Sequence, residues 1–149
     1  MEKIIQVTEQ KEHWLPLLLE ADPSEEMIRG YLDRGELYLL QDGQQAVAAA
    51  VLVALGDGKC ELKNIAVPEE KRGQGYGSRL LRALLRMQRG KSEEMLVGTT
   101  APTEPFYLSL GFSYSHSVPN FFIDHYREPI FEGNVRCVDM RYLKIPVDG

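Results

Sequence analysis

A glycine-rich turn followed by a basic helical pattern has the clearest chemical potential in this sequence. The turn reads RGQGYGS, from Arg72 to Ser78, and the segment from Lys71 to Lys91 holds seven basic and no acidic side chains in a chain of net charge −5. A helix N-terminus presents N–H groups without internal partners and the positive end of the helix dipole, and glycine lets a ligand approach these amides closely. Phosphate oxygens suit such a concavity. The pattern therefore predicts an anion site, with Arg72 and Lys71 adding charge-assisted hydrogen bonds at its mouth.

Other interpretations of this turn stay open from the residues alone. The glycines can serve strand-to-helix geometry only, and the basic residues can form the solvated face of one helix. The sequence has no GxxxxGK string followed by Ser or Thr, so it lacks a P-loop. A dinucleotide fingerprint is disfavoured because Ser78 stands where the third glycine of GxGxxG belongs, and because the preceding strand follows an antiparallel meander.

The elements that must position the turn are predicted by apolar periodicity and turn residues. Strands are expected at residues 3–8, at two stretches of 36–55 flanking the Asp42-Gly43 turn, and at residues 60–67, 94–100, 112–118 and 134–145. Helices are expected at residues 11–21 with Pro16 disturbing the middle, at 22–35 with Ser24 as cap, at 78–90 and at 103–110. Helices on a mostly antiparallel sheet with one strand–helix–strand crossover predict an α/β layered (α+β) fold, taken as a single domain over residues 1–149.

The helix after the turn has two distinct faces. Its apolar stripe consists of Leu80, Leu81, Leu84, Leu85 and Met87. Arginines at spacings of three and four form the opposite stripe: Arg79, Arg82, Arg86 and Arg89. We expect most of the arginine stripe to be solvated.

Composition limits the classes of function. Hydrophobic content of 44% and charged content of 26% are ordinary for a globular domain. Outside the basic segment ten basic residues stand against all 22 acidic ones, which disfavours nucleic-acid binding. No apolar run is long enough to span a membrane. Cys60 and Cys137 form no CxxC pair, and the three histidines show no metal spacing, so we expect a cytoplasmic protein that binds no metal.

Together with its neighbours, the turn resembles a known family. Residues 72–77 match the (Q/R)-x-x-G-x-(G/A) signature of the GNAT superfamily, the acetyl-CoA-dependent N-acetyltransferases. The stretch ELKNIAVPEEKRGQGYGSRLL resembles the family's central strand–loop–helix, and FYLSLGF, residues 106–112, resembles its later helix motif. The order of elements over essentially the whole chain also fits. The tail FFIDHYREPIFEGNVRCVDM resembles a subgroup of small bacterial members.

The resemblance implies a GNAT-like sheet flanked by helices, whose crossover carries the cofactor loop. Main-chain donors of that loop would hold the pyrophosphate of acetyl-CoA. Backbone groups before the loop would bind the pantetheine arm and polarise the thioester carbonyl. The cofactor-binding residues implied in this way are Ile65, Ala66, Val67, Arg72, Gly73, Gln74, Gly75, Tyr76, Gly77 and Ser78.

The resemblance also implies acetyl transfer to a primary amine by direct attack in a ternary complex. An ammonium with a pKa near 10.4 must lose a proton before it attacks. Glu61, eleven positions before Arg72, is the candidate base, and a solvated or Lys63-paired carboxylate is the alternative. Strand alternation would place Glu61 and Lys63 on one face with Ile65 and Val67, unless a bulge intervenes.

Tyr107 matches the family's frequent general acid toward the coenzyme sulfur, and an ordinary amphipathic tyrosine is the alternative. A phenol with a pKa near 10 suits a thiolate leaving group. One departure from the family pattern lies just before this residue. Relatives often place a cofactor-holding asparagine there, whereas residues 99–105 read TTAPTEP. Thr99, Thr100 and Thr103 are the candidates to replace it.

The acceptor is not identified by the sequence, and both small-molecule and peptide amines are compatible with it. Glu128 and Glu132 can attract a cationic amine or be solvated. His116 and His125 can line an acceptor pocket or lie at the surface. A homodimer is compatible with the sequence. The competing functions are a CoA-binding module that has lost turnover and an unrelated α/β scaffold that holds another anion.

Overall fold

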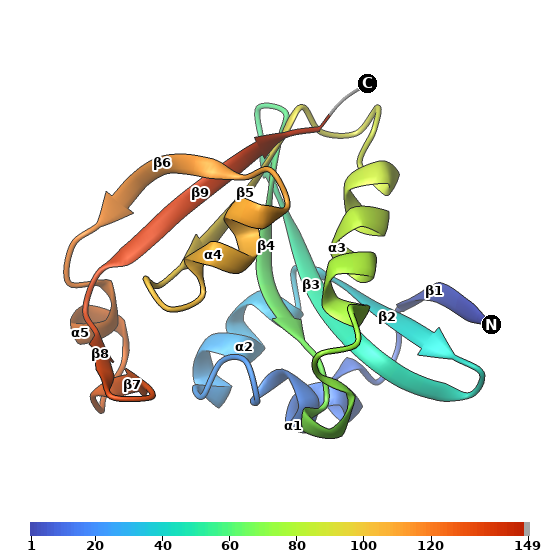
Figure 1. Ribbon diagram of the computed structural model, residues 1–149, viewed down its shortest axis with the longest axis horizontal. Helices are drawn as coiled ribbons and strands as arrows, with labels where there is room; N and C mark the ends of the chain where they lie inside the picture. The colour runs from blue at the N-terminus through green and yellow to red at the C-terminus, as the bar shows by residue number, and fades with distance from the viewer. Residues whose placement is uncertain (148–149) are drawn as a thin grey trace.

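A seven-stranded sheet forms the centre of the protein and has the strand order β1-β2-β3-β4-β5-β9-β6 (Figure 1). The computed structural model describes residues 1–147. All neighbouring strands run antiparallel except β4 and β5, which are parallel and joined through helix α3. The strands of the sheet are β1 (Glu2–Val7), β2 (Glu36–Asp42), β3 (Gln45–Gly56), β4 (Lys59–Ala66), β5 (Glu94–Thr99), β6 (Ser113–Val118) and β9 (Met140–Pro146). The predicted layered fold with one crossover is confirmed.

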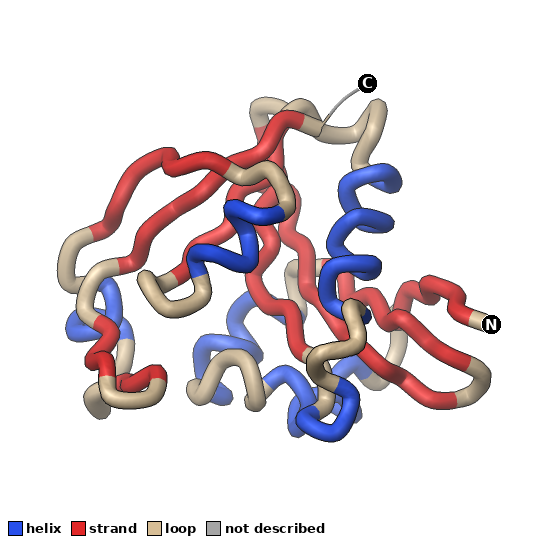
Figure 2. The backbone as a smooth tube through the Cα atoms, in the orientation of Figure 1, coloured by secondary structure: helices blue, strands red, loops and turns tan. Residues whose placement is uncertain are grey.

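Helices cover both faces of this sheet (Figure 2). On one face lie α3 (Tyr76–Met87) and α4 (Glu104–Ser109), whose buried side chains share a core with β2 to β5. On the other face lie α1 (Leu15–Leu18) and α2 (Glu25–Leu32), which form a second core with β2 and β3. Short 3-10 turns, η1 (Lys11–Trp14) and η2 (Glu69–Lys71), precede α1 and α3. None of the helices within residues 1–147 is both long and apolar enough to cross a bilayer.

Two helix starts show how local sequence sets the boundaries. Ser24 caps α2 as predicted, because its side-chain oxygen accepts a hydrogen bond from the Met27 N–H at 3.2 Å. Pro16 is the second residue of α1 instead of lying in the middle of a longer helix. A proline is tolerated in the first turn because its missing N–H would have no partner there. The helix expected over 11–21 with a disturbance at Pro16 is therefore broken, and the segment is a 3-10 turn followed by one helical turn.

The C-terminal segment differs most from the sequence prediction. The single strand expected at 134–145 is two strands, and the first of them, β8 (Val135–Cys137), pairs with β7 (Ile130–Glu132) in a separate hairpin after helix α5 (Phe121–His125). Between β8 and β9, the Asp139 carboxylate accepts from the Asn120 N–H at 2.9 Å and the Val138 carbonyl from the Phe122 N–H at 2.9 Å. These two hydrogen bonds fix residues 138 and 139 between the two strands. The β7–β8 hairpin lies apart from the sheet, next to α5 (Figure 1).

Strands β4 and β5 separate half-way along their length. They pair from Lys59–Glu94 to Leu62–Val97, and beyond this point β4 stays with β3 while β5 stays with β9. Backbone groups on the facing edges of the two strands therefore have no neighbouring strand to bind. This gap is where the cavities described below lie.

A bulge at Lys63 changes the face of β4 that each side chain occupies. Val51 pairs with Asn64 and Leu52 with Leu62, so Lys63 is the extra residue. Because an extra residue reverses the alternation, Glu61 lies on the same face as Asn64, not with Ile65. Simple strand alternation predicted that Glu61 and Ile65 share a face, with a bulge as the stated exception. The bulge is present, so the two side chains lie on opposite faces.

The burial of the α3 stripe gives a stability prediction. Leu80 is fully buried whereas Met87, on the same helix, is 38% exposed. Leu80→Ala should lower the free energy of unfolding by about 2–5 kcal/mol through lost burial and a cavity. Met87→Ala, the matched control, should cost less than about 1 kcal/mol. Urea unfolding followed by circular dichroism measures both, and equal losses would contradict the packing described here.

Candidate active site

Two cavities meet in the gap between β4 and β5. The loop cavity, of about 680 Å³, extends along the turn before α3. The hairpin cavity, of about 540 Å³, extends toward α5 and the β7–β8 hairpin. The residues that line both are Glu20, Ala21, Ile65, Thr103 and Tyr107. The two cavities therefore adjoin each other, and side chains from both faces of the sheet enclose them.

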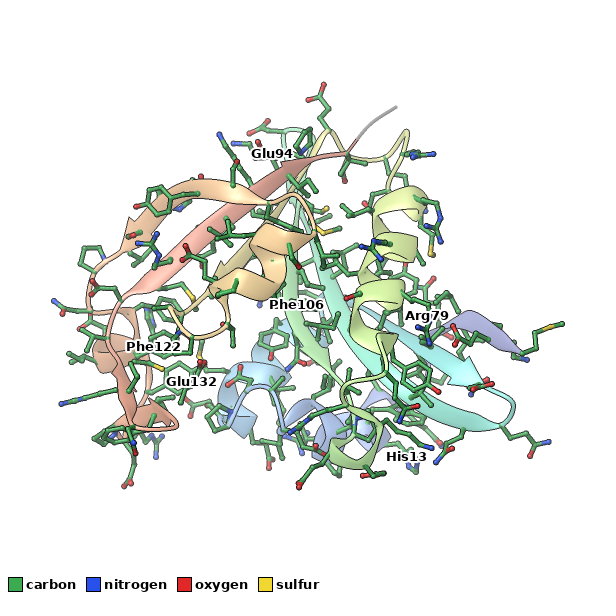
Figure 3. All side chains as sticks on the ribbon, in the orientation of Figure 1. His13, Arg79, Glu94, Phe106, Phe122 and Glu132 are labelled. Atoms are coloured by element: carbon green, nitrogen blue, oxygen red, sulfur yellow. The ribbon has the colours of Figure 1, made fainter. Side chains whose placement is uncertain are left out.

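The loop cavity brings together almost all of the predicted cofactor residues. Nine of them line it: Ile65, Ala66, Val67, Arg72, Gly73, Gly75, Tyr76, Gly77 and Ser78. Gln74 does not, and its carbonyl oxygen accepts a hydrogen bond from Arg79 Nη1 at 3.0 Å. Figure 3 shows Phe106 in the space between α4 and α3, where it forms the opposite wall.

The turn presents a row of unpaired donors to this cavity. Within residues 1–147, the backbone N–H groups of residues 73–78 make no hydrogen bond, and the first intrahelical bond of α3 runs from Arg79 N–H to Gly75 carbonyl at 3.0 Å. Gly75 is the N-cap and therefore supplies no capping side chain. Gly73 and Gly75 both have φ +82, a left-handed conformation that glycine adopts without strain. Free amides at a helix N-terminus fit a phosphate group.

Two arginines brace this loop against the rest of the protein. The Arg72 guanidinium donates to the Val67 carbonyl at 3.0 Å and to the Glu20 carboxylate at 2.9 Å. The Arg79 guanidinium donates to both carboxylate oxygens of Glu2 at 2.9 and 2.7 Å. Both side chains thus hold the loop in place, whereas Arg82, Arg86 and Arg89 are exposed.

Tyr107 lies where the two cavities join. Its side chain is 8% exposed, and its ring packs edge-on against Phe106 and Phe112, with ring centres 5.0 and 5.7 Å away. Burial, and next the negative charge of Glu132, raise the pKa of Tyr107 to about 12. No hydrogen bond within residues 1–147 occupies its hydroxyl group, so the neutral phenol is available as a donor to a ligand.

Glu61 does not join the other predicted residues, because it lines neither cavity. It is buried, at 8% exposure, and its carboxylate accepts a hydrogen bond from Lys63 Nζ at 3.2 Å. Lys63 does line the hairpin cavity, and its ammonium also lies 5.8 Å from the centre of the Tyr31 ring. The role of Glu61 as a base therefore stays a prediction, and contact with a ligand would have to pass through water.

In the connection over residues 99–105, which lacks the family asparagine, the threonines hydrogen-bond one another. The Thr103 hydroxyl hydrogen-bonds that of Thr99 and accepts from the Thr100 N–H at 3.4 Å. Of the three candidates, only Thr103 lines both cavities. Replacement of the missing contact by Thr103 stays a prediction.

The hairpin cavity contains a candidate functional residue that the sequence analysis missed. Asn64 is buried in the wall of this cavity, and Glu132 faces it from β7. Figure 3 shows Glu132 and Phe122 on the side of the C-terminal segment that faces the rest of the protein. His116, stacked on Tyr142 at 4.8 Å, and His125 line neither cavity. Within residues 1–147 no three His, Cys, Asp or Glu side chains gather as metal ligands.

Comparison with known proteins identifies the class. Residues 33–114 match the family model described as an acetyltransferase (GNAT) domain. YvbK of Bacillus subtilis (strain 168), an uncharacterized N-acetyltransferase, is 34% identical over 128 residues, which cover 83% of each chain. The chain therefore belongs to the GNAT acetyltransferase family, as the motifs predicted.

Several solved structures have the same fold as this protein over nearly the whole chain. A GNAT family acetyltransferase from Elizabethkingia anophelis with acetyl-CoA bound has a TM-score of 0.91 and 34% identity, with 97% of both chains covered. An IAA acetyltransferase from Bacillus cereus ATCC 14579 has a TM-score of 0.89 and 32% identity, covering 98% of this chain and 99% of that one. A Bacillus subtilis acetyltransferase in complex with CoA has a TM-score of 0.87 and 31% identity, with the same coverage.

The conformation of Gly73 provides a test of the loop. A Cβ at Gly73 would meet no atom within 4 Å, so an alanine there is strained only by its φ of +82. A left-handed alanine costs roughly 1–2 kcal/mol, and relief of that strain would turn the loop amides away from the cavity. Gly73→Ala should therefore weaken acetyl-CoA binding about tenfold in calorimetry.

Gly43→Ala is the matched control. Gly43 has φ +66 in the β2–β3 turn, has equally open space around it and lines neither cavity. This variant should lose similar stability and keep its affinity for acetyl-CoA. If both variants bind acetyl-CoA as tightly as the parent protein, the loop does not hold the ligand as described.

Proposed function

We propose that this protein transfers an acetyl group from acetyl-CoA to a primary amine by direct attack within a ternary complex. The observation that carries the proposal is the junction of the two cavities at Ile65, Thr103 and Tyr107. A donor in the loop cavity and an acceptor in the hairpin cavity would meet there without a covalent intermediate on the enzyme. Holding both reactants in one geometry supplies a large part of the rate enhancement.

The main chain carries most of the binding of acetyl-CoA in this proposal. The N–H groups of residues 73–78 bind the pyrophosphate, and the backbone of Ile65, Ala66 and Val67, along and just after the free edge of β4, binds the pantetheine arm. The Val67 carbonyl already accepts from Arg72 and is not available to the ligand, whereas an N–H group of this stretch would donate to the thioester carbonyl. A backbone donor aimed at a developing oxyanion lowers the barrier by about 3 kcal/mol.

The proposed transfer requires two protons to leave the acceptor nitrogen. The acceptor enters as an ammonium and loses one proton, its nitrogen bonds to the acetyl carbon and loses a second proton, and the carbon–sulfur bond breaks. Tyr107 gives its proton to the departing sulfur and regains one from solvent, so one proton is released in each turnover. Glu61 stays the proposed base and acts through a water molecule, because its carboxylate does not reach either cavity.

The decisive experiment is thiol release from acetyl-CoA with a broad panel of primary amines. We expect at least one amine to be acetylated. Tight acetyl-CoA binding in calorimetry without turnover on any amine would instead favour a CoA-binding module. No binding at millimolar acetyl-CoA would exclude both functions.

Tyr107→Phe tests the proposed acid. The variant keeps the ring and its packing but cannot protonate the sulfur, so kcat should fall about 100-fold, as for loss of a general acid. The affinity for acetyl-CoA should stay within about twofold. Tyr114→Phe is the control, because Tyr114 is 49% exposed and lines neither cavity. Unchanged turnover in Tyr107→Phe would remove Tyr107 from the mechanism.

The raised pKa of Tyr107 gives a pH prediction. The protonated form is the active one, and a pKa of about 12 keeps it fully populated up to about pH 11, whereas an ordinary phenol is half ionised near pH 10. The kcat with a saturating amine should therefore stay level between pH 9 and about pH 10.5. A fall in kcat with a midpoint near pH 10, absent in Tyr107→Phe, would contradict the assigned environment.

A further inference from the structure

Two buried oxygen atoms in the hairpin cavity lack a hydrogen-bond partner. They are Asn64 Oδ1 and Glu132 Oε2, the two unpartnered buried side-chain polar atoms within residues 1–147. Both residues line the same cavity although they come from β4 and from the β7–β8 hairpin. A buried acceptor without a donor costs free energy of folding, so such groups in one cavity point to a ligand that donates to them.

The neighbours of Asn64 fix which atom of its amide faces the cavity. Its Nδ2 group donates to the Leu18 carbonyl at 3.1 Å and to the Tyr31 hydroxyl at 3.0 Å. The Leu18 carbonyl can only accept, so a flipped amide would place two oxygens against each other. The Tyr31 hydroxyl in turn donates to Asp22 Oδ2 at 3.0 Å, which leaves it free to accept from Asn64. Asn64, at 5% exposure, therefore presents its oxygen to the cavity.

The charged side chains that line this cavity have hydrogen-bond partners, apart from Glu132 Oε2. The charged residues that line it are Glu20, Asp22, Lys63 and Glu132. Glu20 pairs with Arg72, and Lys63 pairs with Glu61. Asp22 accepts from the hydroxyls of Tyr31 and Tyr126 and from the Ser24 N–H. A cationic ligand would therefore find its counter-ion at Glu132.

We propose that Asn64 Oδ1 and the Glu132 carboxylate together bind the acceptor as an ammonium, and that the acceptor is a compact amine with an apolar body. This inference rests on the proposed acetyl transfer. An ammonium has three donors and no acceptor, which matches two converging oxygens. The remaining walls suit an apolar substituent, since they include Phe122, Tyr126, Ile130, Phe131 and Met140.

The position of Glu132 places the amine close to the reaction centre. Glu132 and Tyr107 line the same cavity, and the charge of Glu132 contributes to the raised pKa of Tyr107. Tyr107 lies at the junction of the cavities, where the acetyl group is expected. An amine held by Glu132 and Asn64 would therefore be beside the thioester carbon. Glu132, on the β7–β8 hairpin, would therefore select cationic acceptors.

The test uses one amine and its uncharged isostere. Binding of 2-phenylethylamine and of 2-phenylethanol to the enzyme–CoA complex is measured by calorimetry at pH 7. The parent protein should bind the amine at least tenfold more tightly than the alcohol. Glu132→Gln keeps the side-chain shape and removes the charge, so amine affinity should fall by about 10- to 100-fold and alcohol affinity should not change.

Glu128→Gln is the matched control, because Glu128 is an exposed acid of the same segment that does not line the cavity. It should leave both affinities unchanged. Asn64→Leu, checked by thermal unfolding, is the second variant, and its amine affinity should fall about tenfold. No preference for the amine in the parent protein, or an equal change for amine and alcohol in Glu132→Gln, would overturn the inference.

Failure of this inference can be told apart from failure of the proposed function. If amines are acetylated but Glu132→Gln leaves both KM and kcat unchanged, acetyl transfer stands and the ammonium site is wrong. If the amine preference depends on Glu132 but no amine is acetylated, the binding site stands and the proposed transfer is wrong.

Discussion

The separation of β4 from β5 is the constraint on which the rest of this structure depends. Parallel strands that pair along their full length would satisfy their facing edges and leave no space between them. Here pairing stops at Leu62 and Val97, and the two strands follow different partners. A cavity can therefore pass between the faces of the sheet, so that α1–α2 residues and α4 residues enclose one space. A reaction centre in the middle of a sheet is possible only because that edge is left unpaired.

The same constraint explains why so much of the proposed binding relies on the main chain. The free edge of β4 is followed by the 3-10 turn η2 and then by the glycine turn, whose amides are also unpaired, so two groups of donors lie close together along the chain. Side chains support this arrangement from outside. Arg72 ties the turn to Val67, just after β4, and to Glu20, just after α1, and Arg79 ties the first turn of α3 to β1. Two basic residues of the segment therefore position the loop.

Local signals predicted the parts of the fold that depend on local physics. Ser24, the Asp42-Gly43 turn and the leucine stripe of α3 each determine their element through neighbouring residues, and the observed bounds agree closely. The bulge at Lys63 depends on pairing with β3, and at the break between β8 and β9 Asp139 contacts Asn120. Neither contact is visible in a linear sequence. The orientation of the Asn64 amide was equally hidden, because Leu18 and Tyr31 fix it from remote positions. Strand β4 also contains Lys59, Glu61 and Lys63, so a polar residue at position 64 gave no distinct signal.

The most direct test of the central claim is a nuclear magnetic resonance titration of the backbone amides with CoA. The account predicts that the N–H signals of residues 73–78, together with those of Ile65 and Val67, shift on binding. The amides of the β2–β3 turn around Gly43 should keep their positions. If CoA binds while the signals of residues 73–78 stay unchanged, the turn does not hold the pyrophosphate and the account is wrong.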